Sequence, residues 1–274
     1  MSKHIFIIQP DEDPLNPREE WDNLGTMYTW HRNYSFGGKD DESHKDHIED
    51  FYEFVIGKFH VPGTENFEYR YGTLEQFPTA EQEDRKEYLE SLEDLPDDGV
   101  EELEELTNLY DRYEPIHKAQ FERTVDAWVK ENLVILPLYL YDHSGITMNT
   151  TGFSCRWDSG QVGVIYCTRE QADKLGAPWD KVEEQLKVEV EVYDQYITGD
   201  VYGIRQMEIP DDYEVPERYR YKGNTYILDY WDDESLCKEL LEEFEDDSCW
   251  EYFGHKDTLE VAKSEADQLL GGGV

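Results

Sequence analysis

The amino-acid sequence predicts an α+β fold, with a central mixed or antiparallel sheet, flanking helices and an acidic helical insertion. Apolar runs of strand length recur along the chain, and between them lie stretches whose apolar residues repeat near every 3.6 positions. The chain also carries 20 Tyr, 11 Phe and 7 Trp, enough apolar surface to build a core. At 274 residues it can form one large domain, so we expect a single α+β domain over 1–274.

Five short apolar segments, bounded by polar or turn residues, are predicted to be strands. The most apolar one, 133–141, is nearly continuous, as expected for a strand that is buried on both faces. Pro137 within it cannot donate a backbone hydrogen bond, which predicts a bulge or an open side at that point. The five predicted strands are 4–9, 133–141, 161–167, 200–209 and 225–231.

Helical spacing is clearest in residues 80–131, where Phe121, Val125 and Trp128 fall on one stripe. Pro96 and Pro115 are expected to divide this region into three helices. The opposite faces are rich in Asp and Glu, so a separate helical subdomain at 80–131 is left open.

Further helices are predicted towards the end of the chain, at 178–198, 234–245 and 257–270. Residues 187–192 alternate like a strand, but the wider apolar spacing favours a helix that ends at Gly199. The last helix is expected to begin at a capping box formed by Asp257 and Glu260.

Charge is the dominant feature of the composition. The chain has 65 Asp and Glu against 25 Lys and Arg, a formal net charge of −40. Such a field repels nucleic acid and anionic lipid, and it favours basic proteins as partners. Residues 133–168 have a charge of −1, whereas 38–132 and 169–274 each carry −18. We therefore expect the neutral block to form the core.

Several classes of protein are disfavoured by simple patterns. The chain begins without a signal-peptide pattern, and no stretch approaches the roughly 20 apolar residues needed to span a bilayer. Its four Cys are far apart, with no CxxC pair, which is typical of reduced intracellular thiols. We expect a cytoplasmic protein with no membrane contact, no direct nucleic-acid contact, no cofactor and no metal; a homo-oligomer is left open.

The loop 142–160 is where reactive groups gather away from the acidic segments. Asp142, His143, Ser144, Cys155 and Asp158 could together supply a nucleophile, a base and an orienting carboxylate. The loop has no GxSxG elbow or other spacing that assigns these roles. The sequence therefore favours the alternative, an Asx- and Ser/Thr-rich turn that braces the sheet.

Two other segments have both a functional and a structural interpretation. His44 and His47 are three residues apart and could share a metal ion, but a solvated polar stretch is the favoured interpretation. Residues 21–32 combine aromatic and polar side chains and could form a binding groove; covering an edge of the core is favoured.

The acidic surface has three interpretations. Ordinary solubility does not explain it, because a net charge of about 2–8 in magnitude suffices for a small domain. Salt adaptation in a halophile is the second, although Lys, at 14 against 11 Arg, is not depleted. The third is mimicry of DNA, in which carboxylates occupy a basic cleft. The acids expected to bind such a partner are Glu101, Glu102, Glu104, Glu105, Asp211, Asp212, Glu242, Glu243, Asp246 and Asp247.

Three motifs carry a resemblance: LPLYLYDHSGITM at 136–148, WDSGQVG at 157–163 and VYDQYITGDVYG at 192–203. Together with 21–27 and 247–250, they resemble a group of uncharacterised acidic proteins encoded by phages, archaeal viruses and other mobile elements. The resemblance implies an accessory protein that acts in the cytoplasm of a host cell, and it assigns no catalytic residue.

The leading hypothesis is a non-enzymatic protein-binding factor. It would act as a DNA-mimic-like inhibitor of a host nucleic-acid-binding defence enzyme, of the anti-restriction or anti-CRISPR type. One alternative is a small hydrolase or nucleotide-modifying enzyme with its site in loop 142–160. The other is a halophilic virus protein whose acidity is an adaptation to salt.

Overall fold

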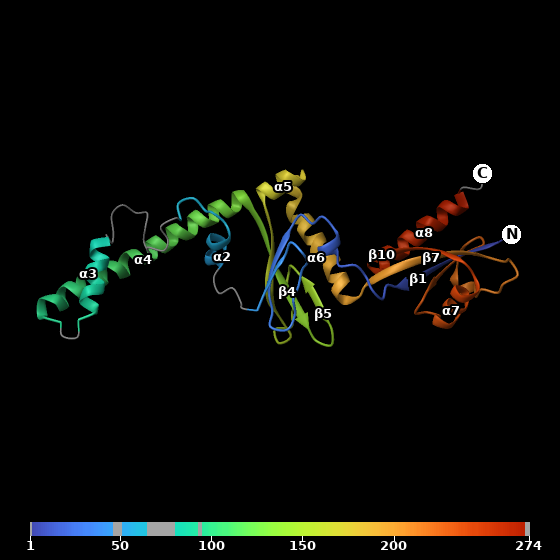
Figure 1. Cartoon of the computed structure of the whole chain (residues 1–274), viewed down its shortest axis with the longest axis horizontal. Coiled ribbons are helices and arrows are strands. Elements are labelled where there is room, and N and C mark those ends of the chain that lie inside the picture. The colour runs from blue at the N-terminus through green and yellow to red at the C-terminus, as the bar shows by residue number, and fades with distance from the viewer. Residues whose placement is uncertain (1, 46–50, 65–79, 93–94, 272–274) are drawn as a thin grey trace. The chain divides into compact units, whose positions relative to one another are not determined.

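A computed structural model describes residues 2–45, 51–64, 80–92 and 95–271. They form two compact units. The first contains residues 1–46, 135–167 and 171–274, and the second contains 47–134 and 168–170. The predicted α+β class is confirmed, because the described residues combine helices with two mixed five-stranded sheets (Figure 1). No helix in these ranges is long and apolar enough to cross a membrane.

The first sheet has the strand order β10-β7-β1-β9-β8. Its central strand, β1, is antiparallel to β7 and parallel to β9. The strands are β1 (Lys3–Pro10), β7 (Val201–Ile209), β8 (Arg220–Lys222), β9 (Thr225–Asp229) and β10 (Asp246–Phe253). Two helices pack on this sheet, α7 (Glu234–Glu243) and α8 (His255–Gly271).

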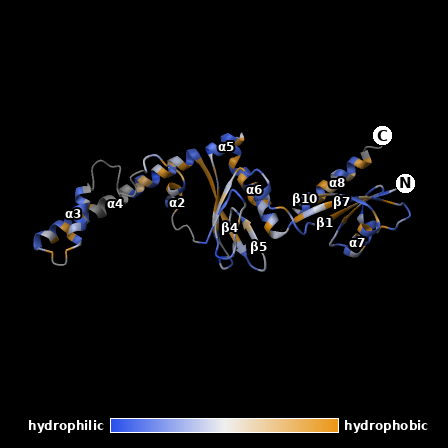
Figure 2. Cartoon of the chain, viewed as in Figure 1, coloured by the Kyte–Doolittle hydropathy of each residue, from blue (hydrophilic) through white to orange (hydrophobic). Residues whose placement is uncertain are grey.

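Strand β1 is buried on both faces because successive side chains point to opposite sides of a sheet. Ile5 and Ile7 join a core cluster that includes Leu240 of α7. Phe6 lies in a different cluster, with Ala262 of α8. The sheet is thus the middle layer between α7 and α8. Figure 2 shows β1 as largely apolar, whereas α3 in the second unit is largely hydrophilic.

The beginning of α8 corrects one prediction. The expected capping box at Asp257 is wrong, since the helix begins at His255, directly after Gly254. The backbone N–H of His255 donates to Oδ1 of Asp200 (3.2 Å). The first turn is thus capped by a residue that is distant in sequence, which no local pattern could reveal.

The second sheet has the order β3-β2-β6-β4-β5. Its strands are β2 (Thr26–Trp30), β3 (Glu42–His44), β4 (Leu133–Asp142), β5 (Ile146–Asn149) and β6 (Ser159–Thr168). Short helices α1 (Pro17–Glu20) and α5 (Arg169–Leu175) precede β2 and follow β6.

Helix α6 (Val182–Thr198) lies against the edge strand β5. It ends at Gly199, which adopts the left-handed conformation (φ 75°), as the sequence predicts. Asp194 of α6 accepts a hydrogen bond from the backbone N–H of Met148 in β5 (2.6 Å). This contact covers an edge that would otherwise expose unpaired backbone groups.

The second unit contains α2 (Phe51–Lys58), α3 (Ala80–Glu90) and α4 (Asp97–Asn132). The region 80–131, considered above as a subdomain, lies in this unit. The predicted division at Pro115 is wrong, because α4 continues through it. A proline inside a helix costs about 3 kcal/mol and removes one hydrogen bond, which a helix of 36 residues can absorb.

Candidate functional sites

The loop 142–160 joins β4, β5 and β6 at one end of the second sheet. The backbone N–H of Asp142 donates to the carbonyl of Asp158 (2.8 Å), so the end of β4 lies beside the start of β6. Between β4 and β5 the chain turns through His143, Ser144 and Gly145, with φ of 60° at Ser144 and 155° at Gly145. Ser144 is therefore an exposed turn residue at the tip of a hairpin.

Asp158 lies between two of the predicted site residues. The Cys155 thiol donates a hydrogen bond to Oδ2 of Asp158 (3.4 Å). Nδ1 of His143 lies 3.7 Å from the same oxygen, too far for a direct hydrogen bond. The side chains of His143 and Asp158 are 64% and 36% exposed. The structure thus brings together His143, Cys155 and Asp158 in contact with solvent.

This arrangement differs from a catalytic triad. Activation of a nucleophile requires a base within hydrogen-bond reach of it, and Cys155 is bonded to a carboxylate rather than to the imidazole. Part of the loop has the bracing role that the sequence favours. Oδ1 of Asn149 accepts the backbone N–H groups of Thr151 (3.0 Å) and Gly152 (2.7 Å), which forms an Asx turn.

Two neighbours of this loop were not predicted from the sequence. The Tyr34 hydroxyl donates to Oδ1 of Asp142 (3.4 Å), and its ring stacks on His31 with centroids 4.9 Å apart. Nδ1 of His31 accepts the backbone N–H groups of Asn33 and Tyr34, both at 3.2 Å. Burial lowers the pKa of His31, and Arg32 adds to the effect against the opposing charge of Asp142. Because Nδ1 accepts both N–H groups, the neutral form of the His31 imidazole carries its proton on Nε2.

The strand that precedes these residues, β2, places Met27 and Trp30 in the interior of the fold. This part of 21–32 therefore contributes to the core. His44 stacks on Tyr28, with ring centroids 4.5 Å apart, and its side chain is 43% exposed. His47 lies outside the described residues.

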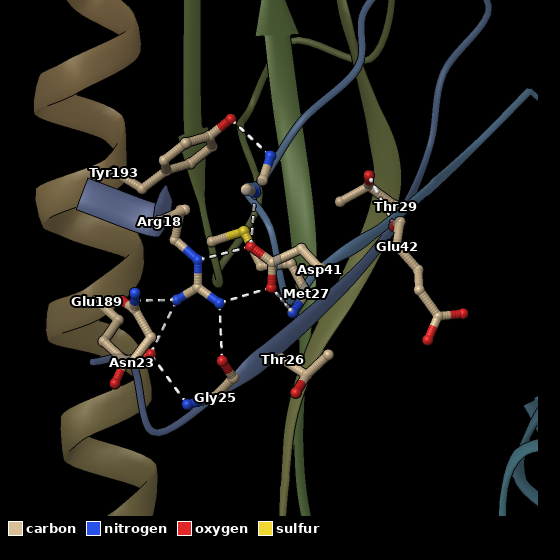
Figure 3. Close-up of polar contacts among 12 residues, drawn as sticks. Arg18, Asn23, Gly25, Thr26, Met27, Thr29, Asp41, Glu42, Glu189 and Tyr193 are labelled. Atoms are coloured by element: carbon tan, nitrogen blue, oxygen red, sulfur yellow. Dashed lines mark hydrogen bonds and ion pairs between the residues drawn. The ribbon is translucent and has the colours of Figure 1, made fainter. Parts of the chain in front are cut away.

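The most enclosed polar network in the described part of the first unit surrounds Arg18 (Figure 3), and no local sequence pattern predicts it. Arg18 is 3% exposed. Its guanidinium makes a bidentate pair with Asp41, with N···O distances of 2.9 and 2.7 Å. It also donates to Glu189 (3.0 Å), Asn23 (3.0 Å) and the carbonyl of Gly25 (2.7 Å).

All five N–H groups of Arg18 are therefore used. Burial alone would lower the pKa of Arg18, but the hydrogen bond and charge of Asp41, with those of Glu189, outweigh it and the pKa is raised. Asp41 also accepts the backbone N–H of Met27 (2.6 Å), and Glu189 accepts that of Leu24 (2.7 Å). No N–H group of Arg18 is left to bind a ligand. The network therefore has a structural role: it joins residues 18–41 to α6, and we call it the Arg18 clasp.

The predicted partner-binding acids of the second unit lie near the start of α4. Glu101, Glu104 and Glu105 are exposed and form no ion pair within the described parts of the chain. Glu102 is held by Arg85 of α3, with N···O distances of 2.9 and 2.7 Å.

Tyr213 links the acidic segment that follows β7 to helix α7. Its hydroxyl donates to Glu239 of α7 (2.7 Å). Burial, that bond and the charge of Glu243 raise the pKa of Tyr213 to about 12. The bond to Glu239 thereby ties the segment that contains Asp211 and Asp212 to α7. The exposed predicted acids of the first unit are Asp211, Asp212, Glu242, Glu243 and Asp247.

Asp246 differs from the other predicted acids. It makes a bidentate ion pair with Arg205 (2.7 and 2.9 Å), and its side chain is 12% exposed. Its charge is therefore neutralised within the fold.

Comparison of the chain with protein families, with curated proteins and with solved structures found no match.

Proposed function

We propose that this chain is an acidic, non-enzymatic protein-binding factor of a mobile element. It would occupy the basic cleft of a host nucleic-acid-binding defence enzyme, of the restriction or CRISPR type, as a mimic of DNA. The observation that carries this proposal is the acidity of the α3–α4 pair. Residues 80–90 contain five acids and two bases, and residues 97–105 contain six acids and no base.

The two helices pack through apolar residues and leave their acids outside. Leu89 of α3 is 3% exposed and Leu106 of α4 is 9% exposed. The ion pair between Arg85 and Glu102 also joins them. Glu101, Glu104 and Glu105, which have no ion pair among the described residues, are therefore exposed on a helix whose other side packs against α3.

The spacing of these acids supports mimicry of a phosphate backbone. A helix rises about 1.5 Å per residue, so Glu101 and Glu105 are about 6 Å apart along the axis. Phosphates along a DNA strand are about 7 Å apart, roughly twice the rise per nucleotide. Carboxylates on such a helix would contact the cationic side chains that bind phosphates in the basic cleft of the enzyme.

The experiment that tests this proposal is capture with the immobilised full chain from a lysate of the cells in which it is made. Bound proteins are eluted first with duplex DNA and then with salt. We expect a basic nucleic-acid-binding enzyme that duplex DNA displaces, because both ligands occupy one cleft. Retention of no protein, or of proteins that duplex DNA does not release, would contradict the proposal.

A charge-matched pair of variants separates the helical surface from net charge. One variant carries Glu101→Gln, Glu104→Gln and Glu105→Gln. The other carries Glu12→Gln, Glu19→Gln and Glu20→Gln, at exposed positions of the first unit. Both change the net charge equally. We expect only the first to lose the captured enzyme, and equal loss from both would indicate a non-specific effect of charge.

A second candidate function is a small hydrolase or nucleotide-modifying enzyme. It is favoured by the contact of Asp158 with Cys155 and its proximity to His143. Its test is turnover of nucleoside triphosphates and activated esters by the purified chain. Activity that is lost in His143→Ala and Cys155→Ser would favour the enzyme, and the absence of turnover would count against it.

A further inference from the structure

Trp157, in the loop 142–160, is the most exposed large apolar residue in the described parts of the chain. It is 96% accessible to solvent, and its indole makes no ring contact or hydrogen bond with other described residues. Tryptophan is highly buried on average in folded proteins, and it is enriched among the residues that supply most of the binding energy of protein interfaces. An indole presented in this way is suited to be buried by a partner.

Further aromatic rings lie at the same end of the second sheet. Tyr141, at the end of β4, contacts Phe153 with ring centroids 5.6 Å apart. The stacked pair of Tyr34 and His31 joins this end through the hydrogen bond of the Tyr34 hydroxyl to Asp142. All four rings belong to half-buried residues, so part of each residue remains on the surface. They add apolar area to that of the exposed indole.

The two segments that form this end of the sheet are electrically neutral in sum. Residues 31–36 and 141–160 together contain two bases, Arg32 and Arg156, and two acids, Asp142 and Asp158, in a chain whose net charge is −40. Both arginines are exposed and form no ion pair within the described ranges. The cores of protein interfaces are depleted in charge and enriched in aromatic residues and arginine, which is the composition found here.

We propose that this end of the second sheet is the contact surface of a homodimer, in which Trp157 of each copy is buried against the other copy. Electrostatics favour a second copy as the occupant. A net charge of −40 keeps two copies apart wherever their acidic segments would face each other, and this repulsion is least where the surface is neutral. A basic partner is drawn instead to the acidic segments.

The charged groups at this end suit a two-fold contact. In such a dimer the same surface serves both copies, so each contact between two different residues occurs twice. The exposed guanidinium of Arg156 on one copy can pair with the exposed carboxylate of Asp142 on the other, and symmetry repeats the pair. The contact uses neither α3 nor α4, so it is independent of the DNA mimicry proposed above.

Sedimentation equilibrium of the full chain tests the proposal. We expect a dimer whose dissociation constant falls between 0.1 and 1 M salt, because the screening length shortens from about 10 to 3 Å and the copies repel each other less. Trp157→Ala should raise the dissociation constant about a hundredfold or more. Loss of one anchoring side chain costs about tenfold or more in affinity, and a symmetric dimer loses two.

Trp231→Ala is the matched control, because Trp231 is also exposed (68%) and directly follows β9 in the first sheet. It should leave the dissociation constant unchanged. A second pair separates the local contact from net charge. Arg156→Glu and Lys256→Glu both replace an exposed base with an acid, and only Arg156→Glu should weaken the dimer strongly.

Circular dichroism of each variant verifies folding. A chain that stays monomeric at both salt concentrations would overturn the proposal. Equal dimerisation of the natural chain and Trp157→Ala would also overturn it, since the indole would then lie outside the contact. Assemblies that grow beyond a dimer with concentration would exclude a two-fold contact.

Discussion

Replacing Arg18 with methionine should destabilise the first unit far more than the loss of a surface ion pair. Methionine keeps much of the side-chain length but provides no donor. The substitution leaves the carboxylates of Asp41 and Glu189 without their cation, and those side chains are only 2% and 11% exposed. Neutral backbone N–H donors remain for both carboxylates, but they cannot neutralise the two charges. They belong to Met27 and Gly38 at Asp41, and to Leu24 and Gly25 at Glu189.

The magnitude follows from burial. Removing one partner of a buried ion pair costs about 3–5 kcal/mol, because an uncompensated charge stays in the interior. Whole domains are stable by only about 5–15 kcal/mol. Arg18→Met should therefore remove a large fraction of the stability, and Arg18→Lys should recover little, because an ammonium group cannot form the planar bidentate contact with Asp41.

Urea denaturation, followed by circular dichroism, measures the free energy of unfolding. Arg220→Met is the matched control, because Arg220 also makes a bidentate contact with a carboxylate, that of Glu217, in the same unit. That pair is exposed, with side chains 37% and 75% accessible, and should contribute little to stability because solvent screens it. Equal losses from Arg18→Met and Arg220→Met would refute the argument that the Arg18 network holds this unit together.

Three further predictions concern packing, pH and salt. Gly203→Ala would place its Cβ 2.3 Å from the Trp250 ring, so urea denaturation should show a loss of about 1–3 kcal/mol; no loss would contradict the packing. Burial raises the pKa of Asp194, so its contribution to stability is present below the ordinary Asp pKa and is lost as pH rises through the folded pKa. Asp194→Asn should therefore gain stability relative to the natural chain as pH rises, and an unchanged difference in urea denaturation would contradict this. Salt from 0.1 to 1 M shortens the screening length from about 10 to 3 Å, so the melting temperature should rise, by about 2–4 °C for each kcal/mol gained; unfolding at the lower concentration would favour salt adaptation.

The strands and helices that the sequence predicted well are those with a strong local pattern. The apolar runs at 4–9 and 133–141 appear as β1 and β4. The expected burial on both faces holds for the centre of β1 but is wrong for β4, where only Leu133, Leu138 and Leu140 are buried and the other apolar residues are half-buried. Helix α6 was recognisable from its apolar spacing and from Gly199 at its end. The prediction from local sequence that a helix ends at Pro115 was wrong, because the long helix α4 tolerates the missing hydrogen bond.

The candidate sites were predicted only in part, since they depend on contacts between distant segments. The loop 142–160 stood out by its composition, but the position of Asp158 between Cys155 and His143 depends on how β4 and β6 meet. The clasp joins Arg18 to Glu189 across 171 positions of the chain. A single arginine in an acidic segment has the same local pattern whether it is exposed or buried.

The acidic stretches were easier to predict from the sequence than the ion pairs that individual acids form. Glu101 and Asp246 belong to equally acidic stretches, yet Glu101 has no ion-pair partner among the described residues and Asp246 is bound to Arg205. Pairing depends on which strand lies alongside, and composition carries no information about that.

The measurement that tests the proposed function most directly is competition for duplex DNA on the captured enzyme. The apparent Kd of that enzyme for DNA is measured at increasing concentrations of this chain. We predict that it rises in proportion to the concentration, without a ternary complex, and that the variant with Glu101→Gln, Glu104→Gln and Glu105→Gln has a weaker effect. A ternary complex, or an unchanged Kd for DNA, would contradict DNA mimicry.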